Sequence, residues 1–275
     1  MVDKFGGIGR KYRGPPGPPG KNALELETWA PHSVLRMFRE NEVCTFYCNT
    51  AEDGILDDGK GKPIGLKDRY AEFKPHHKSK KHAICLQNFQ KPIKLDTKYY
   101  GIPLKNSLYK IPHIPPIATA QPSIVVFAFS FRADSTLTDE DDYIFTNKNT
   151  SRGVTISRNA VNILGAEAKL ELHYDQQDWN TMIIQYSFIT DLGKDQCFFI
   201  LNGRRGFFTP RLIKKEERDL YIGGHPDKRN FGNVMLGSFE LYTKTWGMQS
   251  IPPNYIIPND IIYVLQGDIN DRVFQ

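Results

Sequence analysis

The densest group of chemically active side chains is a basic cluster at positions 74–82, where four lysines and three histidines fall within nine residues. Such a cluster can bind an anionic surface, and its charge grows as the histidines protonate at about pH 6. The alternative is an ordinary solvated loop. Aromatic residues are not interleaved, so single-stranded nucleic acid is not an expected partner. The cluster's basic residues are Lys74, His76, His77, Lys78, Lys80, Lys81 and His82.

Patterns that carry catalysis are missing from the sequence. There is no Gly-x-Ser-x-Gly nucleophile turn and no phosphate-binding loop. Glu25 and Glu27 lie two residues apart but in a linker-like region, and Glu216 and Glu217 stand among lysines. We therefore expect a non-catalytic protein.

A short collagen-like pattern lies near the N-terminus, where Gly14, Gly17 and Gly20 are spaced by pairs of prolines. Only glycine fits the axis of three wound chains, so this spacing predicts a trimer. So few triplets need a head that trimerises or a surrounding assembly to hold them together. The alternative is a stiff polyproline II linker on a monomer.

The composition permits one large β domain or two small ones, with 275 residues of which 40% are hydrophobic. The net charge of +5 allows contact with glycans or other anionic surfaces but requires none. No apolar run has the length of a signal peptide or a membrane span, which predicts an atypical export route or a processed form.

Short apolar or alternating runs, separated by Pro, Gly and Lys, follow one another along the chain and predict an all-β fold. A helix is expected only at 31–41, and a loop at 51–65. The predicted strands are 43–48, 83–89, 99–104, 124–132, 143–146, 153–157, 161–164 and 168–174.

The run at 123–131 is the strongest strand, because it is apolar on both faces and therefore typical of the centre of a packed sandwich. One face carries Val125, Phe127, Phe129 and Phe131, and the other carries Ile124, Val126 and Ala128.

The stretch 179–242 is the most informative. A strand begins at Trp179 and another ends in the Asn202-Gly203 turn; after an expected basic loop, a Leu-Tyr-Ile-Gly-Gly strand and a Gly-Ser-Phe strand follow. In order and spacing this series resembles the laminin G-like branch of the concanavalin A-like lectin and glucanase superfamily, over about residues 82–246. The resemblance implies a two-sheet antiparallel jelly roll that binds ligands through its rim loops.

The resemblance also implies a calcium ion at the rim, with oxygen ligands from Asp141 or Asp142 and from Asp227 or Asn230. Two features depart from the pattern. The paired carboxylates of the glucanases are absent, and Cys197 has no later cysteine with which to close the usual disulfide. The four cysteines are expected to be free, buried thiols that act as small apolar groups. The alternative is one disulfide bridge, to Cys85 or Cys197.

These observations predict a tail at 1–22, an extension at 23–81 packed on the sandwich, a jelly roll at 82–250 and a final strand segment at 251–275. The first functional hypothesis is a structural or assembly protein of an extracellular or mineral-associated matrix or of a virion. The second is a lectin-like adhesion module, whose candidate sugar-contacting aromatics are Tyr99, Tyr100 and Trp246.

Overall fold

A computed structural model describes residues 42–69, 81–94, 100–114, 123–188, 197–211, 218–228 and 230–245. Within these ranges the chain forms strands and connecting turns, and no helix long and apolar enough to cross a bilayer occurs there. The predicted helix at 31–41, the collagen-like glycines, and the segment 251–275 lie outside the described residues.

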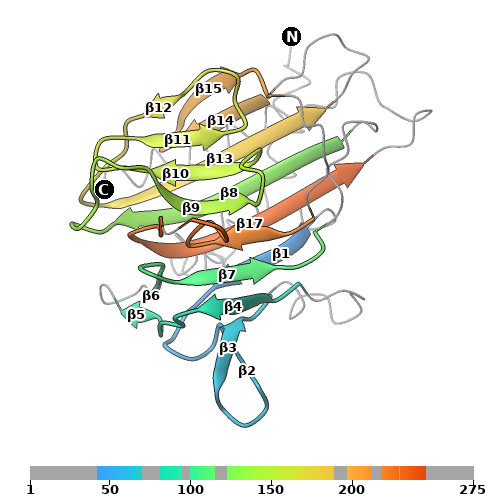
Figure 1. Cartoon of the computed structure of the whole chain (residues 1–275), viewed down its shortest axis with the longest axis vertical. Helices are drawn as coiled ribbons and strands as arrows, with labels where there is room; N and C mark the ends of the chain where they lie inside the picture. The colour runs from blue at the N-terminus through green and yellow to red at the C-terminus, as the bar shows by residue number, and fades with distance from the viewer. Residues whose placement is uncertain are drawn as a thin grey trace, which may run out of the picture. The chain divides into compact units, whose positions relative to one another are not determined.

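One sheet has eight strands in the order β15-β14-β13-β8-β17-β6-β5, with β1 paired to β17 beside this path. Figure 1 shows β13, β8 and β17 side by side as its long central strands. Its members are β1 (Glu42–Tyr47), β5 (Ile93–Lys94), β6 (Tyr100–Pro103), β8 (Ser123–Ala133), β13 (Trp179–Phe188), β14 (Cys197–Leu201), β15 (Arg204–Phe208) and β17 (Val234–Thr245).

The other sheet has nine strands in the order β12-β11-β10-β9-β16-β7-β4-β3-β2. The strand pairings in both sheets are antiparallel, which confirms the all-β jelly-roll prediction. Its members are β2 (Ile55–Asp57), β3 (Pro63–Leu66), β4 (Ala83–Gln87), β7 (Leu108–Ile111), β9 (Asp142–Asn147), β10 (Gly153–Ile156), β11 (Val161–Leu164), β12 (Glu171–Leu172) and β16 (Leu220–Ile222).

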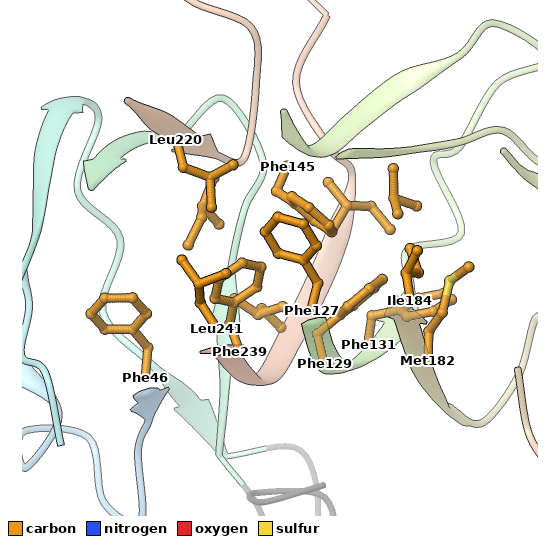
Figure 2. Packing of buried hydrophobic residues seen from close by; sticks show 14 of the residues in the cluster. Phe46, Phe127, Phe129, Phe131, Phe145, Met182, Ile184, Leu220, Phe239 and Leu241 are labelled. Atoms are coloured by element: carbon orange, nitrogen blue, oxygen red, sulfur yellow. The ribbon is translucent and has the colours of Figure 1, made fainter. Parts of the chain in front are cut away.

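An aromatic core fills the space between the sheets. The Phe127 and Phe145 ring centroids lie 4.8 Å apart, and those of Phe145 and Phe239 lie 5.1 Å apart. Figure 2 shows these side chains, from β8, β9 and β17, gathered in one cluster. On the opposite face of β8, Val126 and Ala128 are also buried. Both faces of this strand are therefore covered, as its sequence predicts for a central strand.

Three local predictions need correction. The expected loop at 51–65 contains β2 and the start of β3, because Asp58 accepts the backbone N–H groups that close a turn between them. The expected strand at 168–174 shortens to the two residues of β12. The basic segment after Gly203 is not a loop but the strand β15, which the Asn-Gly turn folds back onto β14.

The cysteines are free, as the sequence favours. Cys44, Cys48 and Cys197 are buried in the core, whereas Cys85 is half-buried. Burial raises the pKa of the Cys48 thiol to about 12, so this side chain stays protonated and acts as a small apolar group.

One side of the sandwich is closed by main-chain hydrogen bonds between the two sheets. Just after β15, the Arg211 amide donates to the Gly165 carbonyl at 2.6 Å, and the Glu167 amide donates to the Thr209 carbonyl at 2.9 Å. Figure 1 shows β12 and β15 on this same side. These bonds satisfy polar backbone groups at a sheet edge that would otherwise be open.

Candidate binding site

A tight hairpin connects β14 and β15. Asn202 and Gly203 have φ angles of 48° and 77°, the left-handed conformation that a two-residue hairpin turn requires. The turn sets Leu201 opposite Arg204, and this register places Phe198 directly opposite Phe207. The Asn-Gly pair therefore decides which side chains of β15 share a face with those of β14.

A buried amide network fixes this turn to β13. The Asn202 side chain accepts from the Thr181 amide at 2.9 Å and donates to the Asn180 side-chain oxygen at 2.7 Å. Asn180 is fully buried, and its oxygen also accepts from the Asp175 amide at 2.8 Å. The hairpin tip is thus held by hydrogen bonds in a fixed position rather than left to fray.

The outer face of this hairpin presents an aromatic ring and a guanidinium group. Phe207 is 62% exposed, which is unusual for so large an apolar side chain. The Arg205 guanidinium carbon lies 4.7 Å from the Phe207 ring centroid and 5.0 Å from that of Phe198. Stacking against two rings restricts the guanidinium, so its position is defined although it is exposed.

Gln185 extends this face toward the middle of the sheet. It lies opposite Phe198, in line with Phe207, and its neighbours Ile184 and Tyr186 point into the core. Alternation along the strand therefore turns Gln185 to the outer face. Gln185 is 2% exposed, and its Oε1 atom has no hydrogen-bond partner among the described residues. We call the set Phe198, Arg205 and Phe207 the hairpin patch; Gln185 lies buried beside it.

The hairpin patch is positively charged. Arg205 is exposed and forms no ion pair with a carboxylate of the described chain. An exposed aromatic ring and a fixed guanidinium on one face are elements of a site for a ligand that is partly apolar and partly polar.

Three of the four predicted calcium ligands are brought together on the other sheet. Asp141 accepts from the Asn162 side chain at 2.9 Å, and its carbonyl accepts from the Asn230 side chain at 3.1 Å. The next residue, Asp142, begins β9 and accepts from the Asn233 side chain at 2.9 Å. These oxygens are therefore already used in hydrogen bonds within the protein.

The fourth predicted ligand, Asp227, pairs instead with Lys148 at 3.4 Å. Beside it, the Lys228 ammonium donates to the Tyr143 hydroxyl at 2.8 Å, and burial lowers the pKa of His225. Among the described residues, no group of three or more His, Cys, Asp or Glu side chains is arranged to hold a metal ion. We call this region the polar rim, with the members Asp141, Asp142, Lys148, Asp227, Lys228 and Asn230.

Most of the basic cluster at 74–82 lies outside the described residues, which include only Lys81 and His82. The Lys81 amide donates to the Asp68 carboxylate at 3.0 Å, and the Asp68 amide donates to His82 Nδ1 at 3.0 Å. These two positions help to hold the segment before β4 in place.

Of the three candidate sugar-contacting aromatics, only Tyr100 lies within the described residues. Tyr100 packs against the core, while Tyr99 and Trp246 lie outside the described residues. Sequence reasoning missed Arg205 and Phe207, although the turn that aligns them was recognised. The Asn202-Gly203 turn could have located them, because a two-residue hairpin turn fixes the pairing of Phe198 with Phe207.

No known protein family matches the sequence, and no curated protein is detectably similar to it. Solved structures with a similar fold do exist. The binding domain of Paraclostridial Mosquitocidal Protein 1 has a TM-score of 0.52 at 10% identity, over 86% of this chain and 53% of that chain. The binding domain of botulinum neurotoxin DC, in complex with SialylT, has a TM-score of 0.50 at 10% identity, over 84% and 52%.

A third similar structure is an enzyme, the Trypanosoma rangeli sialidase in complex with sialic acid, with a TM-score of 0.50 at 11% identity, over 82% of this chain and 33% of that chain. The chain spans about half the length of the toxin binding domains that it matches. At such low identity the likeness concerns the fold alone, and it is consistent with the concanavalin A-like jelly roll.

Proposed function

We propose that this protein is a non-catalytic, lectin-like adhesion module that binds a glycan on the hairpin patch. The observation that carries the proposal is the exposed Phe207 ring with the Arg205 guanidinium held 4.7 Å from its centroid. An exposed aromatic residue needs a reason, and beside a fixed polar group it can pack on the apolar face of a sugar while that group bonds to the hydroxyls.

The strand β14 supports this arrangement from below. Phe198 is buried opposite Phe207 and against the Arg205 guanidinium, so two paired strands hold the exposed ring and the cation together. Side chains fixed on strands are better preorganised than those on loops.

The similar structures support this proposal by analogy. The botulinum neurotoxin DC binding domain was solved in complex with SialylT, cell entry of botulinum neurotoxin type C depends on interaction with two ganglioside molecules, and the sialidase was solved in complex with sialic acid. The botulinum neurotoxin DC binding domain was also solved in complex with rat synaptotagmin II. Because folds host many functions, the argument for a glycan rests on the hairpin patch.

The collagen-like glycines extend the proposal to the assembled protein. A trimer formed through Gly14, Gly17 and Gly20 would present three hairpin patches to one surface, and linked weak sites gain affinity by avidity. A stalked adhesion head of this kind suits an extracellular matrix or a virion. Light scattering on the full chain and on a chain lacking residues 1–22 tests this part: a trimer that weakens on truncation supports it, and two monomers contradict it.

Glycan-array binding of the full chain tests the function itself. We expect Phe207→Ala to reduce binding at least tenfold, because the packing surface is lost. The matched control is Leu86→Ala on β4, since Leu86 is a similarly exposed apolar residue at 52% exposure. Equal binding by the wild type and Phe207→Ala would exclude the hairpin patch, and the absence of any glycan ligand would refute the function.

A further inference from the structure

We infer that the hairpin patch selects a sugar that carries an anionic group, a carboxylate or a sulfate, which Arg205 binds through the edge of its guanidinium. This inference rests on the proposed glycan-binding function and specifies its ligand class. Three features of the hairpin patch support it: how Arg205 is held, which charges surround it, and how β15 sets it beside Phe207. The polar rim provides a contrast.

The first feature is the orientation of Arg205. A guanidinium that stacks on aromatic rings uses its flat face, while its N–H donors lie in the plane and point outward at the edge. Both Phe198 and Phe207 lie at stacking distance, 5.0 Å and 4.7 Å from the guanidinium carbon. The donors at the edge match the two oxygens of a carboxylate or sulfate, which arginine binds as a fork.

The second feature is the charge around Arg205. No described carboxylate forms an ion pair with Arg205. Some other cations do have acidic partners, such as Lys110 with Asp219 at 2.6 Å and Lys169 with Glu171 at 2.8 Å. An exposed and unpaired arginine on an edge strand leaves room for a negative charge supplied by a ligand.

The third feature is the way the strand carries Arg205 and Phe207. They are two residues apart on β15 and face the same side, with Gly206 between them on the opposite side. A Cβ at Gly206 would lie 2.2 Å from the Phe199 ring, so any other residue here would require that ring to move. One rigid strand thus fixes the ring that contacts the sugar next to the group that binds its charge.

The polar rim cannot serve an anionic ligand in the same way. Its lysines already contact protein groups, Asp227 in one case and the Tyr143 hydroxyl in the other. Asp139 and Asp227, whose side chains are largely exposed, would repel an anion near this region. Charge therefore directs an acidic sugar to the hairpin patch.

The test measures the affinity of the full chain for three immobilised oligosaccharides that share one core: a neutral galactoside, its sialylated form and its sulfated form. The variants are Arg205→Ala, Arg205→Lys and Phe207→Ala. The charge-matched control is Arg158→Ala, an exposed arginine of the other sheet's loops. Thermal unfolding of each variant confirms that it is folded.

We expect the wild type to bind the sialylated or the sulfated form at least tenfold more tightly than the neutral form, and the stronger of the two identifies the anion. Arg205→Ala should weaken binding of the anionic form at least tenfold more than it weakens binding of the neutral form, and Arg205→Lys should restore the preference only in part because lysine has no fork. Arg158→Ala should bind like the wild type.

Two other outcomes separate the inference from the function on which it rests. If the wild type binds all three forms equally, or Arg205→Ala weakens them equally, the preference for an anion is overturned while glycan binding stands. If none of the three binds and a wider array is also negative, the proposed function fails, and the inference fails with it.

Discussion

The hairpin patch and the polar rim both display charged side chains at the surface, but they use them in opposite ways. In the polar rim, Asp141 accepts from Asn162 and Lys228 donates to Tyr143, so neighbouring groups satisfy one another. In the hairpin patch, aromatic rings hold the Arg205 guanidinium by its face, and no described carboxylate occupies its donors. A charge that is positioned without being neutralised is available to a ligand, whereas a paired charge mainly serves the fold.

The contrast predicts that rim variants change stability without changing binding, and that patch variants change binding with little effect on stability. A cation–π contact at an exposed site contributes only about 0.5–1 kcal/mol. A buried polar group that loses its partner costs about 1–3 kcal/mol. Single substitutions in the two regions therefore test this contrast between stability and binding.

The largest effect is expected for Asn180→Ala, which removes the buried amide beneath the hairpin turn. Asn180 bonds to Asn202 and to the Asp175 backbone, so the free energy of unfolding should fall by about 3 kcal/mol. Glycan affinity should fall as well, because the turn that aligns the patch loosens. Urea unfolding and binding titrations measure the two effects, and unchanged affinity in the folded variant would show that the turn does not position the patch.

A smaller effect is expected for Asp141→Ala in the polar rim. The Asn162 side chain would lose its acceptor in a buried position, which should lower the free energy of unfolding by about 2 kcal/mol. Glycan affinity should stay within twofold of the wild type. Loss of glycan binding in a stable Asp141→Ala protein would instead place the binding site at the rim.

The pH dependence of stability should come in part from His225, which lies next to the polar rim. Burial lowers the pKa of His225, so the folded protein binds this proton less tightly than the unfolded chain does. Its contribution is therefore neutral above the ordinary histidine pKa of about 6.5 and destabilising as the pH falls below it. Unfolding at pH 7.5 and pH 5.5 should show a loss that shrinks in His225→Gln; an identical loss in that variant would assign it to other groups.

Calcium should have the smallest effect. If Asp141 and its neighbours bind the ion with a Kd of about 1 mM, the weak end for extracellular modules, 1 mM calcium adds only about 0.4 kcal/mol to stability. A rise in the unfolding midpoint that Asp141→Asn removes would support the predicted rim ion. A midpoint that calcium leaves unchanged would argue against it.

The sequence predicts most of the fold because the fold depends on simple patterns. The two apolar faces of the run at 123–131 identify β8 as a central strand, and the Asn202-Gly203 turn locates a hairpin. The strands β2 and β3 were not predicted, because they are short and lack a long run of alternating apolar residues. Arg152, buried with its guanidinium 4.5 Å from the Tyr186 ring centroid, could not be foreseen because charge normally indicates exposure.

The binding site was harder to predict for a physical reason. Metal and acid–base sites have characteristic residue types and spacings, whereas the hairpin patch combines two rings and one guanidinium from two strands. Phe198 and Phe207 become neighbours only through the register of β14 and β15. The acidic residues predicted at the rim do meet there, at Asp141, Asp142 and Asn230, but their hydrogen bonds are made within the protein.

The main-chain bonds that close the sandwich beside β15 have a mechanical consequence for an adhesion module. A pull on a ligand at Phe207 passes along β15 to Thr209 and Arg211, which bond to Glu167 and Gly165 of the opposite sheet. The load is thus divided between two sheets, and β15 cannot peel away from β14 one hydrogen bond at a time. Tethered in this way, the hairpin can resist a tensile force that would unzip a free edge strand.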